Sequence, residues 1–293
     1  MPSLGVASND SANLMQPQAD ASRKAVLKLR ARHSMTDKAS SLSILTLNVW
    51  NREGPWPRRL SLIRSWLHRL QPDLIGFQEV VDPKHTQELL SECDFHSAWM
   101  GTTSGIAIAA RWPIHDRQQL WLPGDDKSTG GPALRGMVHS PYGIIPFTCA
   151  TTAFYMTHDG YKRERQMPAL NEFARGRAKG DFPAILVGDF NTDPESAEIR
   201  YLKGLQSLEG TSAYWCDAWD QAGDGSKGAT WSRSNDFAAW APWPNRRIDY
   251  IFVAQPRLDG AGTIEHCSVV CNEKLDDAWP SDHFGVFARV KAT

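Results

Sequence analysis

The segment from Ala184 to Pro194, A-I-L-V-G-D-F-N-T-D-P, constrains the fold more than any other part of the chain. Its run of four apolar residues predicts a buried strand, and the turn formers that follow end this strand near Asp189. Sheets of α/β proteins usually place their chemistry at the carboxyl ends of their strands, where Asp189 and Asn191 stand. A carboxylate and an amide two residues apart both reach a metal-bound phosphate group if the backbone turns there. An ordinary turn with Asx hydrogen bonds uses the same residue types, so this segment alone leaves both interpretations open.

The residues before this segment predict two strands, each followed by a helix. Residues 43–48 form a strand that ends at Asn48, and residues 73–78 form a second strand that leads into Glu79. The Asp82-Pro83 pair starts the second helix, with the aspartate as N-cap. Residues 57–70 place one set of apolar side chains on a single helical face, namely Leu60, Ile63, Trp66, Leu67 and Leu70. The arginines of this helix are expected mostly elsewhere: Arg58, Arg59, Arg64 and Arg69.

The remainder of residues 42–293 alternates between strand-rich and helical stretches. A run of short strands separated by Gly, Pro and Asp is expected over 95–99, 105–111, 118–122, 133–138 and 144–152. Helices follow at 161–178 and from Pro194, and the last strands are expected at 247–253, 264–270 and 284–290. The region between Asp217 and residue 246 is rich in tryptophan and reads as loop. This order predicts an α/β protein in which two mixed β-sheets pack face to face with helices outside.

Composition and charge restrict the function without identifying it. The chain has 293 residues with a net charge of −1, so it carries no bulk signature of nucleic-acid binding. Residues 1–41 hold six Lys and Arg against three Asp, which leaves 26 basic and 30 acidic residues for 42–293. A phosphate substrate would therefore need a local cationic site, most simply a bound metal. The five cysteines lack zinc-ligand spacing and are expected to be reduced thiols.

The chain is expected to consist of a disordered tail followed by one folded domain. Residues 1–41 are rich in small and polar residues and predict a disordered N-terminal tail, in which a short basic helix after Ser22 is the alternative. Residues 42–293 contain no dividing linker and predict one catalytic domain. The sequence shows neither a transmembrane run nor a signal-peptide core, which favours a cytoplasmic protein without stable membrane insertion. No pattern indicates a protein partner.

Several polar residues occupy comparable places at strand ends. Asn48, Glu79 and the Asp189–Asn191 pair each follow an apolar strand, and Asp249 interrupts the apolar run I-D-Y-I-F-V, where an unpaired carboxylate is costly. Asp282 and His283 stand immediately before the last strand. Each residue alone has a structural explanation as a turn residue, a cap or a core histidine. Their repeated occurrence at strand ends favours a common active site.

These motifs are similar to those of a known family. L-T-L-N-V-W, P-D-L-I-G-F-Q-E-V, G-D-F-N-T-D-P, R-R-I-D-Y-I-F-V and P-S-D-H-F-G resemble, in this order, the motifs of the endonuclease/exonuclease/phosphatase superfamily, over roughly residues 43–291. The resemblance implies a four-layer αββα sandwich. It also implies Mg²⁺-dependent cleavage of phosphoester bonds, with Mn²⁺ as a substitute ion.

The resemblance further implies a role for each matched residue. Glu79 corresponds to the main metal ligand and Asp282 to a carboxylate that supports the metal or its network. Asn48 and Asn191 correspond to amides that face the phosphate, and Asp189 to the residue that positions the attacking water. His283 corresponds to the essential histidine, whose ring Asp249 orients. Whether Asp189 or His283 accepts the water proton stays open, as does the number of metal ions, although Trp50 at the position of a second carboxylate favours one.

One position departs from the family pattern. Many members carry Thr-His-Leu before an Arg-x-x-Gln helix, whereas this chain has Ala153 at the histidine position, with Arg163 and Gln166 at the expected spacing. The rival alignment places His158 there instead. The expected activity is hydrolysis of a phosphodiester by in-line attack of water, with nucleic acid, DNA or RNA, as the leading substrate class. The alternatives are a phospholipid headgroup, a soluble phosphomonoester, or a non-catalytic protein that binds a phosphate ligand.

The tryptophans near residues 231–243 have two interpretations. Trp231, Trp240 and Trp243 would either stack on a nucleobase or pack in the core. Core packing explains most tryptophans in most proteins, and it is the interpretation we favour for these three.

Overall fold

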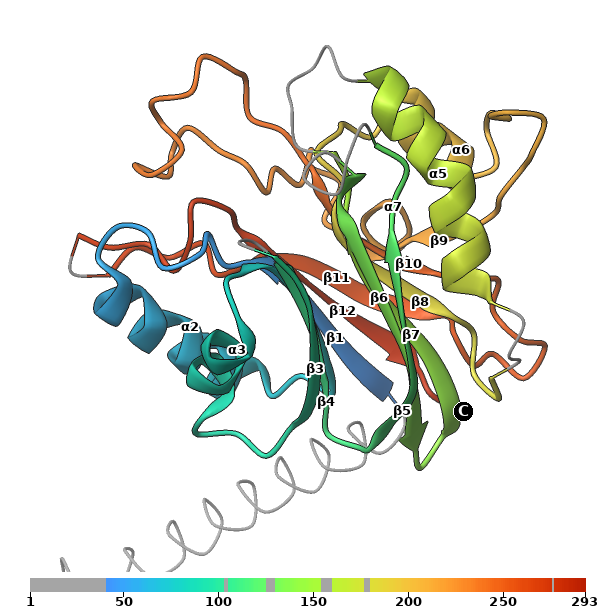
Figure 1. Cartoon of the computed structure of the whole chain (residues 1–293), viewed down its shortest axis with the longest axis horizontal. Helices are drawn as coiled ribbons and strands as arrows, with labels where there is room; N and C mark the ends of the chain where they lie inside the picture. The colour runs from blue at the N-terminus through green and yellow to red at the C-terminus, as the bar shows by residue number, and fades with distance from the viewer. Residues whose placement is uncertain (1–40, 103–104, 125–129, 154–159, 177–179, 276) are drawn as a thin grey trace, which may run out of the picture. The chain divides into compact units, whose positions relative to one another are not determined.

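Two six-stranded β-sheets packed face to face make up the centre of residues 42–293 (Figure 1). The computed structural model describes residues 41–102, 105–124, 130–153, 160–176, 180–275 and 277–293. The basic segment after Ser22 and His158 lie outside the described residues. None of the described helices is long and apolar enough to cross a membrane.

The first sheet has the strand order β11-β12-β1-β2-β4-β3. Its strands are β1 (Ser41–Asn48), β2 (Leu74–Val80), β3 (His96–Gly101), β4 (Gly105–Ala110), β11 (Ile264–Val270) and β12 (Gly285–Lys291). The second sheet has the order β5-β6-β7-β8-β10-β9. Its strands are β5 (Ile114–Trp121), β6 (Pro132–Ser140), β7 (Gly143–Thr151), β8 (Ile185–Asp189), β9 (Cys216–Asp217) and β10 (Asp249–Val253).

Helices cover the outer face of each sheet, which completes four layers (Figure 1). The first sheet packs against α2 (Trp56–Leu70) and α3 (Pro83–Leu90) through one apolar cluster. The second packs against α5 (Gly160–Arg175) and α6 (Ala197–Leu202) through another. The short helix α7 (Ala218–Ala222) follows β9. The predicted αββα sandwich with two mixed sheets is therefore confirmed.

The central strands are mostly apolar because both of their faces are buried. In β1, Leu42 and Ile44 point into the cluster between the sheets, whereas Leu45 and Leu47 point toward the helices. Successive side chains of a strand alternate between its faces, so a strand in the middle of four layers has no polar side. The run of apolar residues in β8, which predicted a buried strand, has the same cause.

Strand direction brings the expected site residues to one end of the two sheets. β1 and β2 are parallel, with Asn48 opposite Gln78, and β7 and β8 are parallel, with Thr151 opposite Asp189. β10 runs antiparallel to β8 and places its first residue, Asp249, directly opposite Asp189.

Three details differ from the expectations. Arg59, expected away from the apolar face of its helix, is completely buried. The helix expected from Pro194 begins at Ala197, because the Ser196 side chain caps it by accepting from the backbone N–H of Ile199. The region expected to be loop contains β9 and α7. All five cysteines are free thiols, and all but Cys93 are buried.

The two sheets approach each other closely around Gly76 of β2. A Cβ atom at Gly76 would lie 2.4 Å from Val187 Cγ2 and 3.1 Å from Cys149 Sγ, both in the opposite sheet. Glycine is therefore required here by packing and not by backbone conformation.

We expect Gly76→Ala to destabilise the protein by about 1–3 kcal/mol, because the added methyl group overpacks the space between the sheets. Val187→Ala alone should also destabilise it, by leaving a cavity. The double variant should lose less than the sum of the two, because the new methyl group fills the space that Val187 vacates. Chemical denaturation of the four proteins measures this coupling, and strictly additive losses would contradict the packing argument.

Candidate active site

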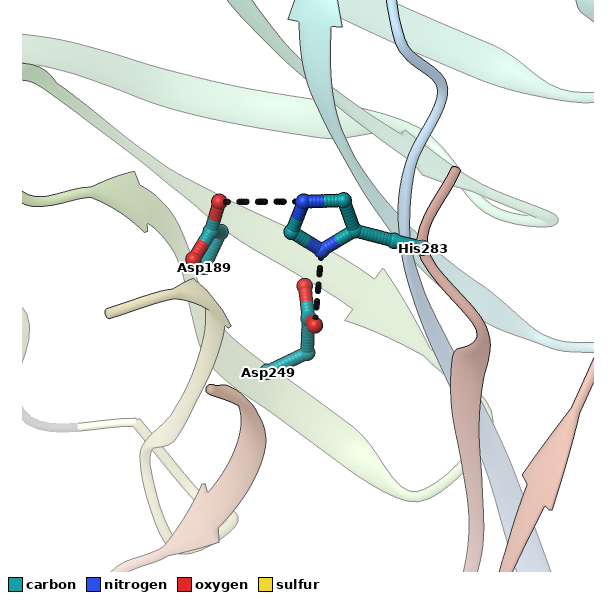
Figure 2. Close-up of side chains that lie close together, drawn as sticks. All are labelled: Asp189, Asp249 and His283. Atoms are coloured by element: carbon teal, nitrogen blue, oxygen red, sulfur yellow. Dashed lines mark hydrogen bonds and ion pairs between the residues drawn. The ribbon is translucent and has the colours of Figure 1, made fainter. Parts of the chain in front are cut away.

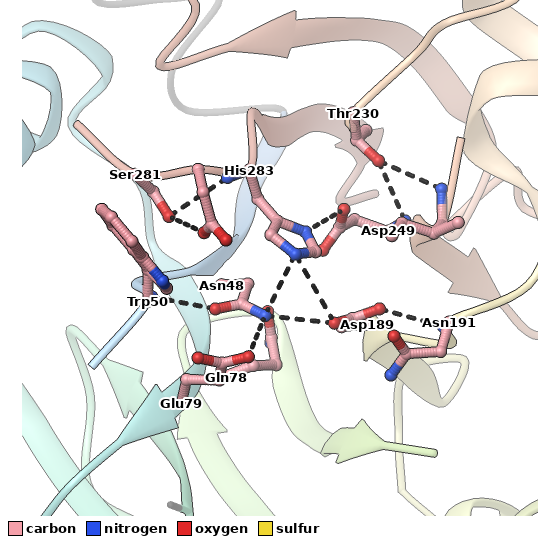
Figure 3. A network of polar contacts seen from close by, with 12 residues as sticks. Asn48, Trp50, Gln78, Glu79, Asp189, Asn191, Thr230, Asp249, Ser281 and His283 are labelled. Carbon is pink, nitrogen blue, oxygen red and sulfur yellow. Dashed lines mark hydrogen bonds and ion pairs between the residues drawn. The ribbon is translucent and has the colours of Figure 1, made fainter. Parts of the chain in front are cut away.

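The side-chain amide of Asn48 joins the polar residues of the two sheets (Figure 3). Its Nδ2 donates to Glu79 Oε1 and to Asp189 Oδ2, both at 3.1 Å, and lies 3.4 Å from His283 Nε2. Asn48 Oδ1 accepts from the backbone N–H of Trp50 at 2.9 Å. Asn48 is completely buried, so each of these groups is held by protein contacts.

Glu79 reaches the site through an irregularity in β2. The register between β2 and β4 shifts between Gln78 and Val80, and Glu79 occupies this bulge with a φ of 56°. A bulge turns one side chain out of the alternation of the strand, and a positive φ at a glutamate is a strained conformation. The bulge directs the carboxylate toward Asn48 and not into the sheet.

Asp189 uses both carboxylate oxygens. Oδ1 accepts from the backbone N–H of Asn191 at 2.9 Å, which forms an Asx turn, while Oδ2 accepts from Asn48. Asn191 has a φ of 51°, and its Nδ2 donates to the carbonyl of Thr152 at 3.3 Å. Gly188 is needed just before, because a Cβ there would lie 1.9 Å from the Ala150 carbonyl oxygen. The segment thus forms the Asx turn, and the same turn leaves Asp189 Oδ2 in contact with Asn48, while the catalytic role of Asp189 and Asn191 stays a prediction.

His283 forms a hydrogen-bonded pair with Asp249 (Figure 2). The distance from Nδ1 to Asp249 Oδ2 is 2.9 Å, which leaves Nε2 facing Asp189 Oδ2 at 4.0 Å. The ring of Trp231 packs edge-on against the imidazole with centroids 4.9 Å apart. The backbone N–H of Asp249 donates to Thr230 Oγ1 at 3.2 Å, which anchors the backbone at the start of β10.

Burial and mutual repulsion shape the charges of this group. Burial raises the pKa of Asp189 to about 6, and the charge of Asp249 adds to this rise. Burial also raises the pKa of Asp282 to about 6 and lifts the pKa of Glu79 above its usual range. Burial alone would lower the pKa of His283, but the charges of Asp249, Asp189 and Asp282 raise it well above its ordinary value.

Arg59 is the functional residue that sequence reasoning missed. Its guanidinium donates to the carbonyls of Val49, Glu53 and Pro280, and so ties the loop after β1 to the loop that carries His283. Helical spacing did contain the signal, since Arg59 precedes Ile63 by four residues and therefore lies on the same face. Burial lowers the pKa of Arg59 to about 10, which still leaves it charged at neutral pH.

Ala153 stands beside the site without an imidazole. Its backbone N–H donates to Gln166 Oε1 at 2.8 Å. Gln166 Nε2 donates to the carbonyls of Pro123 and Gly130, both at 2.8 Å. This glutamine of α5 therefore fixes three points of backbone around the site.

The three tryptophans of the 231–243 region have different environments. Trp231 packs on His283, as described above. Trp240 is 73% exposed, so the packing interpretation is wrong for this residue, and its ring meets that of Trp243 edge-on at 6.3 Å. The start of this loop is fixed to the site, because Asn235 Nδ2 donates to the carbonyl of Ser281 and Phe237 packs on Trp50.

The donor set suits a divalent cation. Asp189, Asp249 and His283 offer three ligand atoms within 4.8 Å of one another. With Glu79 and Asp282, the site holds four carboxylates against the two cationic side chains of His283 and Arg59, an excess of two negative charges when all are ionised. Oxygen-rich sites with this charge are what hard divalent cations prefer.

Comparison with known proteins gives this arrangement a family. The model of the endonuclease/exonuclease/phosphatase family matches residues 45–283. The chain belongs to this family. Members of it hydrolyse phosphoester bonds, which makes this chain a phosphoester hydrolase.

Individual relatives differ in what they act on. A putative neutral sphingomyelinase of Caenorhabditis elegans is 25% identical over 86% of this chain and 67% of its own length. Among solved structures, D. rerio TDP2 complexed with a single-strand DNA product has a TM-score of 0.70 at 20% identity, covering 86% of this chain and 99% of that one. The mannosyl-6-phosphatase of Bacteroides thetaiotaomicron has a TM-score of 0.65 at 20% identity, covering 85% and 99%. These likenesses establish the fold, not the substrate.

We expect Asp282→Asn to stabilise the metal-free protein at pH 8 by roughly 1–3 kcal/mol, because the folded state then no longer holds an ionised carboxylate with a raised pKa. The unfolded carboxylate ionises near pH 3.8, so the gain should fade as the pH falls through 6 toward 4. Thermal unfolding in EDTA measures it.

The exposed Asp277 supplies the control, since Asp277→Asn changes only a surface ion pair with Lys274. An Asp282→Asn protein that is equally stable or less stable than wild type at pH 8 would contradict the electrostatic argument.

Proposed function

We propose that this protein is a Mg²⁺-dependent phosphodiesterase that uses water as the nucleophile, with Mn²⁺ as a substitute ion. The observation that carries this proposal is the Asn48 amide held between Glu79 and Asp189, with His283 Nε2 facing Asp189 at 4.0 Å. On one side of the Asn48 amide, Glu79 offers a carboxylate to a cation. On the other side, Asp189 and His283 form an acid–base pair. A protein that only bound a phosphate ligand would have no need for this acid–base pair.

Glu79 and Asp282 are the residues that we assign to the cation. Each oxygen of Glu79 accepts one amide hydrogen, which orients the carboxylate and leaves further lone pairs. Asp282 is oriented by Ser281, whose hydroxyl donates to Oδ1. When bound, the cation neutralises phosphoryl charge as a Lewis acid.

The chain's own residues position the reactants and move the proton. Asn191 donates one side-chain hydrogen to the Thr152 carbonyl and presents the other to the phosphoryl oxygens, while Asn48 holds Glu79 and Asp189 in place beside them. Asp189 and His283 act as a coupled pair: water attacks phosphorus, its proton goes to this pair, and the bond from phosphorus to the leaving oxygen breaks. Asp249 fixes the ring so that Nε2 faces the reaction.

Nucleic acid is the substrate class that we propose first. The exposed Trp240, on a loop anchored beside His283, offers a surface on which a base can stack. The D. rerio TDP2 structure, which has the same fold and is complexed with a single-strand DNA product, supports this choice. The sphingomyelinase relative supports a phospholipid headgroup as the second candidate.

A generic aryl phosphodiester tests the reaction class. We expect turnover with Mg²⁺, none in EDTA, and a loss of about 10²–10⁴-fold in kcat for His283→Ala, because the proton-transfer pair is broken. The exposed His266 on β11 provides the control variant His266→Ala, which should retain full activity. Activity that survives both EDTA and His283→Ala would exclude the proposed mechanism.

A substrate panel tests the class of phosphoester. It contains single-stranded DNA, abasic duplex, 5′-phosphotyrosyl DNA, sphingomyelin and inositol phosphates. We expect turnover of the nucleic acids, and Trp240→Ala should lower kcat/KM on single-stranded DNA by about tenfold, since stacking on one base contributes roughly 1–3 kcal/mol. The same variant should leave turnover of the aryl diester unchanged. Turnover confined to sphingomyelin would assign the lipid instead.

A further inference from the structure

Two consecutive residues after β1 adopt a costly backbone conformation. Trp50 has a φ of 52° and Asn51 a φ of 44°. Tryptophan rarely occupies the left-handed region, and such a residue costs of the order of 1–3 kcal/mol, which its surroundings must offset, whereas asparagine tolerates this region better than most residues. Arg59 helps to impose it, because its guanidinium donates to the Trp50 carbonyl at 3.4 Å and lies 4.8 Å from the centre of the Trp50 ring.

The result of this conformation is that Asn51 contacts Glu79 twice. The backbone N–H of Asn51 donates to the Glu79 carbonyl at 3.1 Å. Its side-chain Nδ2 donates to Glu79 Oε2 at 2.9 Å, while Asn48 donates to Oε1. Glu79 itself sits in a bulge with a positive φ. Two strained segments thus meet at one carboxylate, and an amide fixes each of its oxygens.

The contact between Asn51 and Glu79 has an energetic cost at the side-chain oxygen of Asn51. Oδ1 is buried and has no hydrogen-bond donor among the described residues. An unsatisfied buried acceptor is unfavourable by about 1–3 kcal/mol. Turning the amide over would not help, because Oδ1 would then face the carboxylate oxygen of Glu79. The amide therefore has its NH₂ group toward Glu79 and its Oδ1 without a donor among the described residues.

We propose that Asn51 is a positioning residue of the metal site, which fixes Glu79 in the orientation that binds the cation. None of the family motifs in the chain assigns a role to this residue. The inference rests on the proposed function, because it assumes that Glu79 is a metal ligand. Partners that orient a ligand typically change metal affinity by 10- to 100-fold when removed.

A glycine substitution at position 51 distinguishes the effect of the side-chain amide from the effect of the backbone conformation. Asn51→Gly removes the side chain but tolerates a φ of 44° without strain, whereas Asn51→Ala removes the side chain and adds strain, because alanine disfavours this φ more than asparagine does. Titration calorimetry with MnCl₂ should show Mn²⁺ binding weakened 10- to 100-fold in both variants. The melting temperature of the metal-free protein should fall only for Asn51→Ala. Raising the Mn²⁺ concentration should restore kcat on an aryl phosphodiester in Asn51→Gly.

Two further proteins make the outcome decisive. Glu79→Gln should lose Mn²⁺ binding, and Asn245→Gly, which removes an exposed asparagine on the 231–246 loop, should bind as wild type does. Wild-type affinity in Asn51→Gly, together with loss of binding in Glu79→Gln, would overturn the role of Asn51 and leave the proposed function intact. A wild-type protein that binds neither Mn²⁺ nor Mg²⁺ would overturn both.

Discussion

The contact between Asn48 and two carboxylates is the interaction on which the site depends. Glu79 belongs to one sheet and Asp189 to the other, and a single NH₂ group donates to both. Because each of its hydrogens has one acceptor, a shift of one sheet relative to the other would break at least one bond. The apolar packing between the sheets, close where Gly76 meets Val187, therefore also sets the distance between the proposed metal ligand and the proposed proton-transfer pair. Core packing and site geometry are in this sense one constraint.

The same contact gathers negative charge where water cannot solvate it. Glu79, Asp189, Asp249 and Asp282 lie together, and burial is the main reason why the pKa values of three of them are raised. The charges of His283 and Arg59, together with hydrogen bonds from Asn48, Asn191 and Ser281, offset only part of this cost. Buried carboxylates that repel one another destabilise the site when no cation is bound, and the same negative charge attracts a divalent cation. The destabilisation of the empty site and its affinity for metal therefore have the same origin.

Sequence pattern predicted the layers well because both faces of the central strands are buried, which leaves uninterrupted apolar runs such as that of β8. It also singled out Asn48, Glu79 and Asp189, because a polar residue at the end of such a run is conspicuous, and Asp249, because it interrupts one. It did not show how Glu79 turns toward Asn48, since a bulge between Gln78 and Val80 depends on the pairing with β4. The helical spacing indicated that Arg59 lies on the buried face of α2, but the expectation that arginine is solvated led to the opposite prediction. The exposure of Trp240 had no signal, since it depends on a loop that Asn235 anchors from a distance.

The backbone around Ala153 borders the site at the position where many family members carry a histidine. In place of an imidazole, the backbone N–H of Ala153 is fixed by Gln166, and the same amide fixes the carbonyls of Pro123 and Gly130. The neighbouring Thr152 carbonyl in turn accepts from Asn191. Helix α5 is therefore linked to the Asn191 amide through the backbone of Thr152 and Ala153. A histidine at this position would add one more charge and donor. The mechanism proposed above instead assigns the acid–base chemistry to Asp189 and His283, where the contacts of Asp249 and Trp231 orient the imidazole.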